Sequence, residues 1–496
     1  MSQDRPQFED FELLVNAARE PDCYPVTLIQ SPAGQANGTL KLELQTAEIQ
    51  TALQSIAGRQ TTEDSLRQFG QQLFDKLMAD PIGDSYRKSQ GLAQGAGKRL
   101  RVRLRLDPPE IAALPWEYLY DARDEFPLAI SRNHCLSRYV QVSETVRSLQ
   151  VELPLRVLVV VSDPSNLSDI GAEPLNAAEE IKRIRQALQQ HEQAGRIKTE
   201  ILPHAVAPDL RDKLREFRPH VVHFIGHGDQ GKLVMEEEDH TLRLVSDTQF
   251  RNFFLDAEDT KLVLLNACKG AAQSSADVMR GVAQQVVRRG PGAVVAMQYI
   301  IPDAVSLTFA REFYRALAQY YPVDAAVAEG RRAVYMDHGS DQPDWGTPVI
   351  FMRSPDGVLF SPPQTRPEPA AQTPTGPVTS VIGAGANLQG ANVQIGNVAG
   401  GDIISSTTQP ATPVGGPRPS SGGQPAEIAQ LVNILTTRFD VNELETLAFD
   451  LGLDWDNLEG KTRDNKIRNL VDHMRRYGRL PELANHIRQT RPDIQW

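Results

Sequence analysis

Two stretches decide the fold that the sequence predicts: HVVHFIGHG at residues 220–228 and KLVLLNACKG at residues 261–270. Each contains a short run of Val, Leu, Ile or Phe, which is typical of a buried β-strand and too short for a helix. Each run ends in a polar, glycine-containing segment, so His227 and Cys268 both follow directly after a strand. Because ligands bind at the carboxyl ends of the strands in an open α/β sheet, we expect His227 and Cys268 at such an edge.

Strands and helices alternate on both sides of these two stretches. Further apolar strands are predicted at 155–161, 199–203, 291–297 and 347–352, and the last of them is expected to close the sheet. Amphipathic helices are predicted at 173–190, 209–217, 275–289, 304–321 and 324–335. A hairpin is predicted at 233–245, around the acidic turn 236–239. Repeated βα units of this kind predict an α/β fold with a mostly parallel sheet and helices on both of its faces.

Changes in composition divide the 496 residues into four regions. Residues 1–150 mix helix and strand patterns and are expected to pack on the α/β domain of residues 151–360. Residues 361–425 are rich in Pro, Gly, Ser and Thr, which is typical of a linker that cannot bury enough apolar surface to fold. Residues 426–496 predict a small all-α bundle of a size that suits docking to a partner. Its helices are predicted at 427–438, 442–451, 466–476 and 481–488.

Composition and charge exclude several classes of function. The net charge of −11 argues against a nucleic-acid or membrane-surface partner. No apolar run reaches the roughly 18 residues that a membrane helix needs, and residues 1–10 do not resemble a secretory signal. The three cysteines, Cys23, Cys135 and Cys268, have no disulfide or metal-ligand spacing, which favours a reducing, cytoplasmic location. No motif for zinc, serine or nucleotide chemistry is present, so we expect no metal and no cofactor.

Arginine occupies every second position of the predicted strand at 99–106. Since side chains alternate between the two faces of a strand, these arginines share one face. The stripe would either bind an anion or form the solvated face of an edge strand, and we favour the edge strand. The neighbouring aromatic segment 114–121 is expected to pack against the following domain.

A thiol beside an imidazole is the arrangement that catalysis by a cysteine nucleophile requires. The thiolate is the reactive form, and an adjacent imidazole takes up the proton of the thiol. With Cys268 as nucleophile and His227 as base, the backbone N–H groups of Gly228 and Cys268 would form a two-donor oxyanion hole. This assignment requires the two strands to be neighbours in the sheet. The alternative is that Cys268 only packs in the core, because free cysteine is among the most buried residue types.

Other polar residues near the two strands are assigned less chemistry. His223 lies inside its strand and is predicted to be a packed core histidine, whereas His220 and His240 are predicted at the surface. Three acidic residues would make a pocket for a basic side chain if they faced the pair: Asp229, Asp277 and Asp303. Solvated loop carboxylates are the alternative, and we favour it.

The motif HFIGHG at 223–228, followed by LLNAC at 264–268, resembles the CHAT family of caspase-like cysteine peptidases. The resemblance covers about residues 100 to 355 and includes LPWE at 114–117, GAVVAM at 292–297, Asp303 and WGTPV at 345–349. It implies a caspase-like sheet of the kind shared with separases and gingipains. It also implies His227 as general base, Cys268 as nucleophile, and endopeptidase activity on a protein substrate.

The C-terminal region resembles the death-like effector-associated domains of bacterial conflict systems. The residues that carry this resemblance are ELETLAFDLG at 443–452, Trp455 and RRYGRL at 475–480. Such domains pair with like domains, so the resemblance implies a partner protein that carries a similar domain.

The linker contains one patterned segment, residues 385–404. GANLQ at 385–389 repeats as GANVQ at 390–394, and VQIG at 393–396 resembles the core of the amyloid-forming RIP homotypic interaction motif. Short, uncharged and proline-free, the segment would self-assemble through stacked strands. A glycine-rich tether is the alternative, and we favour it.

Together these features predict a bacterial caspase-like cysteine endopeptidase. It would cleave a partner protein when recruited through its C-terminal death-like domain, in antiviral defence or programmed cell death. The alternative is a catalytically inactive scaffold that assembles signalling partners.

Overall fold

The computed structural model describes residues 5–142, 146–172, 174–229, 232–267 and 273–363, together with parts of 425–491. Those parts are 425–439, 443–444, 447–448, 451, 462–476, 480, 483–484, 486–487 and 491. The chain forms two compact units, Met1–Thr375 and Gly376–Trp496. None of the described helices combines the length and the apolar character needed to cross a membrane.

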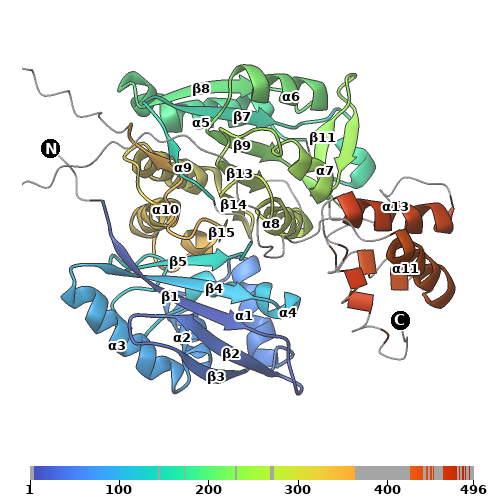
Figure 1. The fold of residues 1–496 in the computed structure, drawn as a ribbon. Helices are drawn as coiled ribbons and strands as arrows, with labels where there is room; N and C mark the ends of the chain where they lie inside the picture. The colour runs from blue at the N-terminus through green and yellow to red at the C-terminus, as the bar shows by residue number, and fades with distance from the viewer. Residues whose placement is uncertain are drawn as a thin grey trace, which may run out of the picture. The chain divides into compact units, whose positions relative to one another are not determined.

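The first unit is built around one eleven-stranded sheet (Figure 1). From edge to edge its strands are β3 (Ala36–Lys41), β2 (Cys23–Gln30), β1 (Phe8–Val15), β4 (Arg99–Leu106), β5 (His134–Tyr139), β15 (Pro348–Met352), β14 (Ala293–Met297), β13 (Leu262–Ala267), β9 (Val221–Gly226), β7 (Leu155–Val161) and β8 (Ile197–Leu202). Neighbours are antiparallel at β3–β2, β2–β1 and β15–β14, and parallel elsewhere. The predicted α/β class with a mostly parallel sheet is therefore confirmed.

Two small sheets accompany the large one. One contains β10 (Gly228–Asp229), β11 (Lys232–Glu236) and β12 (Leu242–Val245), and the other pairs β6 (Leu149–Gln150) with β16 (Phe360–Ser361). The predicted hairpin around residue 239 is thus present as β11 and β12, which are antiparallel. β10 begins one residue after position 227, so the small sheet continues the chain directly from β9.

Helices lie on both faces of the large sheet (Figure 1). They are α1 (Ala47–Ala57), α2 (Glu63–Leu77), α3 (Ile82–Gly95), α4 (Pro109–Ala112), α5 (Ala177–Gln193), α6 (Ala207–Glu216), α7 (Asp247–Asn252), α8 (Gln273–Val286), α9 (Asp303–Leu317) and α10 (Val323–His338), with short 3-10 turns η1 (Trp116–Tyr118), η2 (Leu167–Ile170) and η3 (Pro343–Gly346). The predicted helices from residue 173 onward match α5, α6, α8, α9 and α10 to within a few residues.

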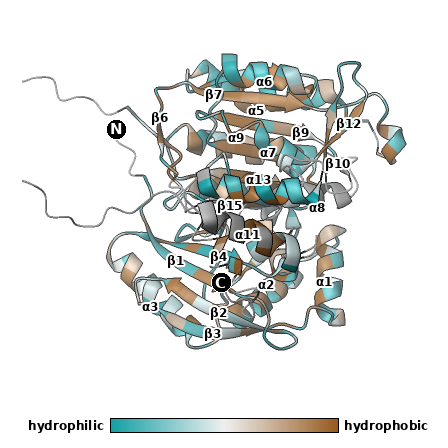
Figure 2. Cartoon of the chain, turned by 45° about the vertical axis from the view of Figure 1, so that its right-hand side comes forward, coloured by the Kyte–Doolittle hydropathy of each residue, from teal (hydrophilic) through white to brown (hydrophobic). Residues whose placement is uncertain are grey.

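Burial on both faces explains why β9 reads as a continuous apolar run. Val221 and Ile225 belong to the core that includes residues of α5 and α9, whereas Val222 and Phe224 belong to the core with α6, α7 and α8. Parallel strands covered by helices on both sides have this composition. Figure 2 shows the contrast between β7, which is hydrophobic along most of its length, and α6, which carries many hydrophilic residues.

The prediction that the strand at 347–352 closes the sheet is wrong. β15 lies inside the sheet, antiparallel to β14 and parallel to β5. Through this contact the strands of residues 1–150 extend the same sheet that holds β9 and β13. Sequence periodicity predicts that a segment is a strand, but pairing order depends on contacts between segments far apart in the chain.

The edge-strand interpretation of the arginine stripe is also wrong. β4 lies between β1 and β5, and the side chains of Arg101 and Arg103 are only 5% and 4% exposed. Arg103 forms a 2.8 Å ion pair with Glu12, its cross-strand neighbour on β1. Arg101 forms a 2.6 Å ion pair with the buried Asp324 at the start of α10. Buried charges require such partners, so the stripe is an internal network that ties α10 to the sheet.

The second unit has a hydrophobic core of its own. Its described helices include α11 (Pro425–Arg438) and α13 (Arg463–Arg476), which contain the predicted helices at 427–438 and 466–476. Leu431 and Leu435 of α11 are fully buried with Leu470 and Met474 of α13. Of the predicted linker only residues 361–363 and Pro425 are described, so the segment 385–404 lies outside the described residues.

Candidate active site

The two strands that precede His227 and position 268 are neighbours in the sheet. β9 and β13 are parallel, and their register aligns His223 with Leu264 and ends with Gly226 opposite Ala267. Gly226 and Ala267, which immediately precede His227 and position 268, therefore end the two strands at the same level. The requirement for neighbouring strands is met. Cys268 itself lies outside the described residues, so the contact between thiol and imidazole stays a prediction.

His227 is held between the large sheet and the small one. Its side chain is fully buried, and its backbone carbonyl accepts a 3.0 Å hydrogen bond from the N–H of Val234 on β11. The next residue, Gly228, pairs with Leu233. These contacts fix the backbone that follows His227. The pairing of β9 in the large sheet fixes the backbone that precedes it.

Gly226, the last residue of β9, is required by close packing. A Cβ atom at this position would lie 2.8 Å from the ring of Phe224 and 3.2 Å from the Cβ of Ser162. Carbon atoms in contact prefer separations of about 3.5–4.0 Å. The glycine therefore lets β9 and the end of β7 approach each other directly before His227.

The structure confirms His223 as a core histidine. It is 2% exposed, and its Nδ1 lies 3.1 Å from the hydroxyl oxygen of Tyr314 on α9. Burial lowers the pKa of His223 to about 3, so its imidazole is neutral near neutral pH. A group that titrates so far below neutrality is a poor general base, which leaves His227 as the candidate.

The surface position predicted for His220 is wrong, whereas that for His240 holds. His220 is 3% exposed and its Nδ1 accepts a 3.0 Å hydrogen bond from the N–H of Arg156. Burial, helped by the positive charge of Arg156, lowers the pKa of His220 to about 4. The side chain of His240 is 50% exposed.

Asn266 is a polar residue of this region that the sequence analysis did not single out. It belongs to β13 and lies two positions before Cys268 in the sequence. Its side chain is 5% exposed, and its Nδ2 lies 3.4 Å from the Oγ of Ser306 on α9. Both residues line a small cavity of about 20 Å³ together with His223 and Asp303. The signal in the sequence was a single amide within an otherwise apolar strand.

Of the three acidic residues considered for a substrate pocket, the structure describes the side chain of Asp303 only. Its Oδ2 forms a 2.9 Å ion pair with Arg183 of α5. A basic substrate side chain at Asp303 would compete with this arginine. The side chains of Asp229 and Asp277 lie outside the described residues.

A model of the CHAT domain matches residues 67–364, more than half of the chain. The chain belongs to the CHAT-domain family. A model of effector-associated domain 7 matches residues 429–492. Both resemblances inferred from the sequence are confirmed, and the CHAT match includes β9, β13 and all the candidate site residues.

Solved structures also show similarity, at low sequence identity. RgpB of Porphyromonas gingivalis, in a complex of its pro- and mature domains, is 13% identical over 62% of this chain and 71% of that chain, with a TM-score of 0.34. The Saccharomyces cerevisiae separase–securin structure is 10% identical over 70% of this chain and 30% of that chain, with a TM-score of 0.41. A secreted C11 cysteine protease from Bacteroides thetaiotaomicron is 11% identical over 37% of this chain and 59% of that chain, with a TM-score of 0.25. A search of curated proteins finds no match.

Within the CHAT domain, the segment LPWE at 114–117 links β5, which belongs to residues 1–150, to the end of β14 in the following domain. Glu117 is 1% exposed and accepts hydrogen bonds of 2.8 Å from both Arg138 on β5 and Gln298 after β14. Burial alone would raise the pKa of Glu117, but Arg138 holds it below its ordinary value. The neighbouring Tyr118 donates a 2.6 Å hydrogen bond to the carbonyl of Pro343 and contacts the ring of Trp345. The predicted packing of this aromatic segment on the following domain is confirmed.

Proposed function

We propose that this CHAT protein is a cysteine endopeptidase, with Cys268 as nucleophile and His227 as general base. The observation that carries the proposal is the register of β9 and β13, which ends with Gly226 opposite Ala267. The two candidate residues are the next ones in the sequence after these strand ends, so we expect both at the same edge of the sheet. Membership of the CHAT family supports the same assignment.

The reaction would proceed in two steps. His227 takes the proton of the Cys268 thiol, and the thiolate attacks the carbonyl carbon of a peptide bond. The N–H groups of Gly228 and Cys268 would stabilise the negative charge on the carbonyl oxygen. His227 returns its proton to the leaving amine, which leaves a thioester, and water then hydrolyses the thioester to a carboxylic acid and the free thiol.

The C-terminal unit supports a recruitment step. Its match to effector-associated domain 7 fits a docking function toward a partner with a similar domain. Recruitment would concentrate the peptidase on a protein substrate, and antiviral defence or programmed cell death is the setting that we propose. For residues 385–404 self-assembly is a separate proposal, and a glycine-rich tether is the alternative that we favour. The unpaired thiols of Cys23 and Cys135 fit a reducing, cytoplasmic compartment.

The test uses the full chain and a peptide-based electrophile that labels reactive thiols. We expect labelling at position 268 in the wild type, and loss of labelling in Cys268→Ala. His227→Ala should reduce the rate of labelling and of peptide hydrolysis by about 10³-fold or more, since the members of a catalytic unit act together. Cys23→Ala is the matched control, because it removes a half-buried thiol outside the CHAT match.

One alternative function remains, the inactive scaffold. It predicts a different outcome in the same experiment. A chain that binds its partner through residues 426–496 but shows no labelling at Cys268, even when clustered on that partner, is a scaffold and not a peptidase.

A further inference from the structure

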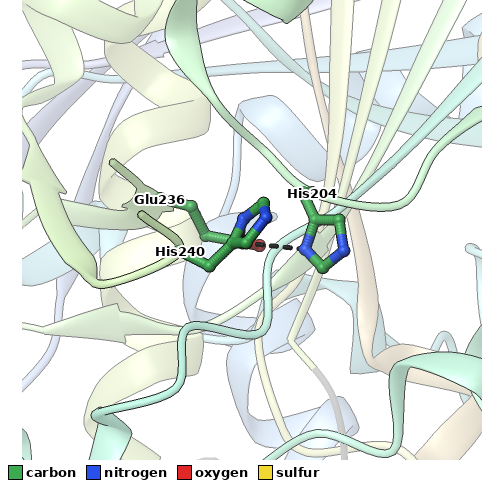
Figure 3. Close-up of side chains that lie close together, drawn as sticks. All are labelled: His204, Glu236 and His240. Carbon is green, nitrogen blue, oxygen red and sulfur yellow. Dashed lines mark hydrogen bonds and ion pairs between the residues drawn. The ribbon is translucent and has the colours of Figure 1, made fainter. Parts of the chain in front are cut away.

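Two histidine side chains, His204 and His240, converge on one carboxylate oxygen of Glu236 (Figure 3). The Nδ1 atom of His204 lies 2.9 Å from the Oε2 atom of Glu236, and the Nδ1 atom of His240 lies 3.1 Å from the same oxygen. His204 follows β8, Glu236 is the last residue of β11, and His240 lies in the turn before β12. One ligand atom from each of the three residues lies within 4.8 Å of those of the other two.

Glu236 is fixed by the backbone around it. Its Oε1 atom accepts hydrogen bonds from the N–H groups of Asp163, at 3.0 Å, and Ala205, at 3.3 Å. Its own N–H donates to the carbonyl of Ala205 at 3.1 Å. The side chain is 0% exposed, although the sequence placed it in an acidic turn. The backbone N–H groups thus hold Oε1, and Oε2 points at the two imidazoles. Hydrogen bonds from surrounding groups orient metal-ligating carboxylates in the same way.

His240 is also held in place by its backbone. Its φ angle is 60°, a left-handed conformation that is uncommon for a residue other than glycine. Its carbonyl accepts a hydrogen bond from the N–H of Ser165 at 3.0 Å, and its N–H donates to the carbonyl of Glu237 at 3.0 Å. The turn therefore presents the imidazole to Glu236 in a defined position.

A buried carboxylate is costly unless it is paired with a cation or coordinates a metal. No lysine or arginine in the described part of the chain forms an ion pair with Glu236; its partners there are the two histidines. We propose that His204, Glu236 and His240 bind a divalent transition-metal cation, and that Zn²⁺ fits the site best.

The donor atoms decide the class of metal. Two imidazole nitrogens and one carboxylate oxygen form a common zinc ligand set, with bond lengths of about 2.0–2.2 Å that place tetrahedral ligands about 3.3 Å apart. The distances of 2.9 and 3.1 Å from the imidazoles to Oε2 are close to this spacing. Ca²⁺ and Mg²⁺ prefer sites made of oxygen atoms alone. The side chains of His204 and His240 are 48% and 50% exposed, so water can fill a fourth position.

The bound cation would join the connection after β8 to the end of β11. Glu236 lies two residues beyond Val234, whose N–H holds the carbonyl of His227. We therefore expect the metal to stabilise the small sheet that follows His227. This expectation concerns stability and does not depend on whether the chain is a peptidase.

The test is a calorimetric titration of Zn²⁺ into the full chain, freed of affinity tags and treated with a chelator. The parent for all variants carries Cys268→Ala, because a cysteine beside a histidine could itself bind zinc. We expect about one Zn²⁺ per chain in this parent, consistent with a single three-residue site. His204→Ala, Glu236→Gln and His240→Asn should each weaken binding by about tenfold or more. Asparagine is chosen at position 240 because it tolerates the left-handed backbone.

The matched control is His338→Ala, which removes a half-buried imidazole that binds Thr308 instead. It should bind Zn²⁺ like the parent. In thermal unfolding, Zn²⁺ should raise the Tm of the parent and of this control but not that of the three site variants, and Mg²⁺ should change none of them. Absence of a Tm shift in the parent, or equal zinc affinity in the parent and His204→Ala, overturns the proposal. Each variant's Tm shift is measured against its own metal-free Tm, and a cooperative metal-free transition in His204→Ala, whose side chain is half exposed in the parent, separates loss of binding from loss of folding.

Discussion

Gly226 and Ala267 face each other as the last aligned residues of two neighbouring parallel strands. The residues that follow them are His227 and Cys268, which the sequence alone had marked as a catalytic pair. Parallel neighbours end at the same edge, and this register brings Gly226 and Ala267 together although they lie 41 positions apart in the chain. The candidate site therefore depends on strand pairing and not on local sequence.

Replacing Gly226 by Ala should disturb the site directly before His227. The added Cβ would lie 2.8 Å from the ring of Phe224, and overpacking of this kind costs about 1–3 kcal/mol. We expect a lower free energy of unfolding in urea and a lower rate of thiol labelling at Cys268. Gly91→Ala on α3 is the control, because nothing lies within 4 Å of its added Cβ and alanine favours a helix by up to about 1 kcal/mol. Equal stability of the two variants would contradict the packing role of Gly226.

Replacing Glu117 by Gln should destabilise the contact between β5 and the end of β14. The change leaves the buried guanidinium of Arg138 without its counter-charge, which costs about 3–5 kcal/mol when one partner of a buried pair is removed. Equilibrium unfolding measures the loss. Glu63→Gln, which removes an exposed i,i+4 pair with Arg67, should change stability by less than about 0.5 kcal/mol. If the two variants lose similar amounts of unfolding free energy, the ion pair of Glu117 contributes no more to stability than a surface ion pair.

Stability should fall as the pH drops below about 6.5, the ordinary pKa of histidine. Burial lowers the pKa of His134 to about 4 and that of His223 to about 3. Between these values and 6.5 the unfolded chain binds more protons than the folded chain, so acid favours unfolding. Each such group contributes a slope of up to about 1.4 kcal/mol per pH unit in this window.

Urea unfolding at pH 7.5, 6 and 5 measures this slope. His223→Gln removes one titrating group and keeps a side chain that can bind the hydroxyl of Tyr314, so its decline between pH 6.5 and 5 should be shallower than that of the wild type. A slope unchanged by this substitution would show that His223 is not a source of the pH dependence.

Replacing Leu470 by Ala should separate recruitment from catalysis. Leu470 is fully buried in the C-terminal unit, and its truncation costs about 2–5 kcal/mol. We expect partner binding to be lost while labelling of Cys268 by a small probe in the absence of partner is unchanged, because the two units have separate cores. Arg468→Ala, at an exposed position of the same helix, should leave the stability of the unit unchanged. Loss of labelling in Leu470→Ala would show that the CHAT domain depends on the C-terminal unit.

Much of this protein follows from its sequence because the relevant signals are local. The apolar runs of β9 and β13, the glycines after them and the amphipathic helices that flank them are set by side-chain periodicity within each segment. The position of His223 inside its strand likewise predicted a core histidine. The family motifs are short and contiguous, which is why the CHAT and effector-associated domains were recognisable.

Only the tertiary structure showed the contacts between segments that lie far apart in the sequence. The arginines of β4 look like a solvated stripe until β1 and α10 supply Glu12 and Asp324 as buried partners. Glu236 looks like part of an exposed acidic turn until the backbone after β7 and β8 encloses it. The physical reason is the same in both cases. A charge can be buried only where another part of the chain provides its counter-charge or hydrogen bonds, and no pattern within one segment reveals that partner.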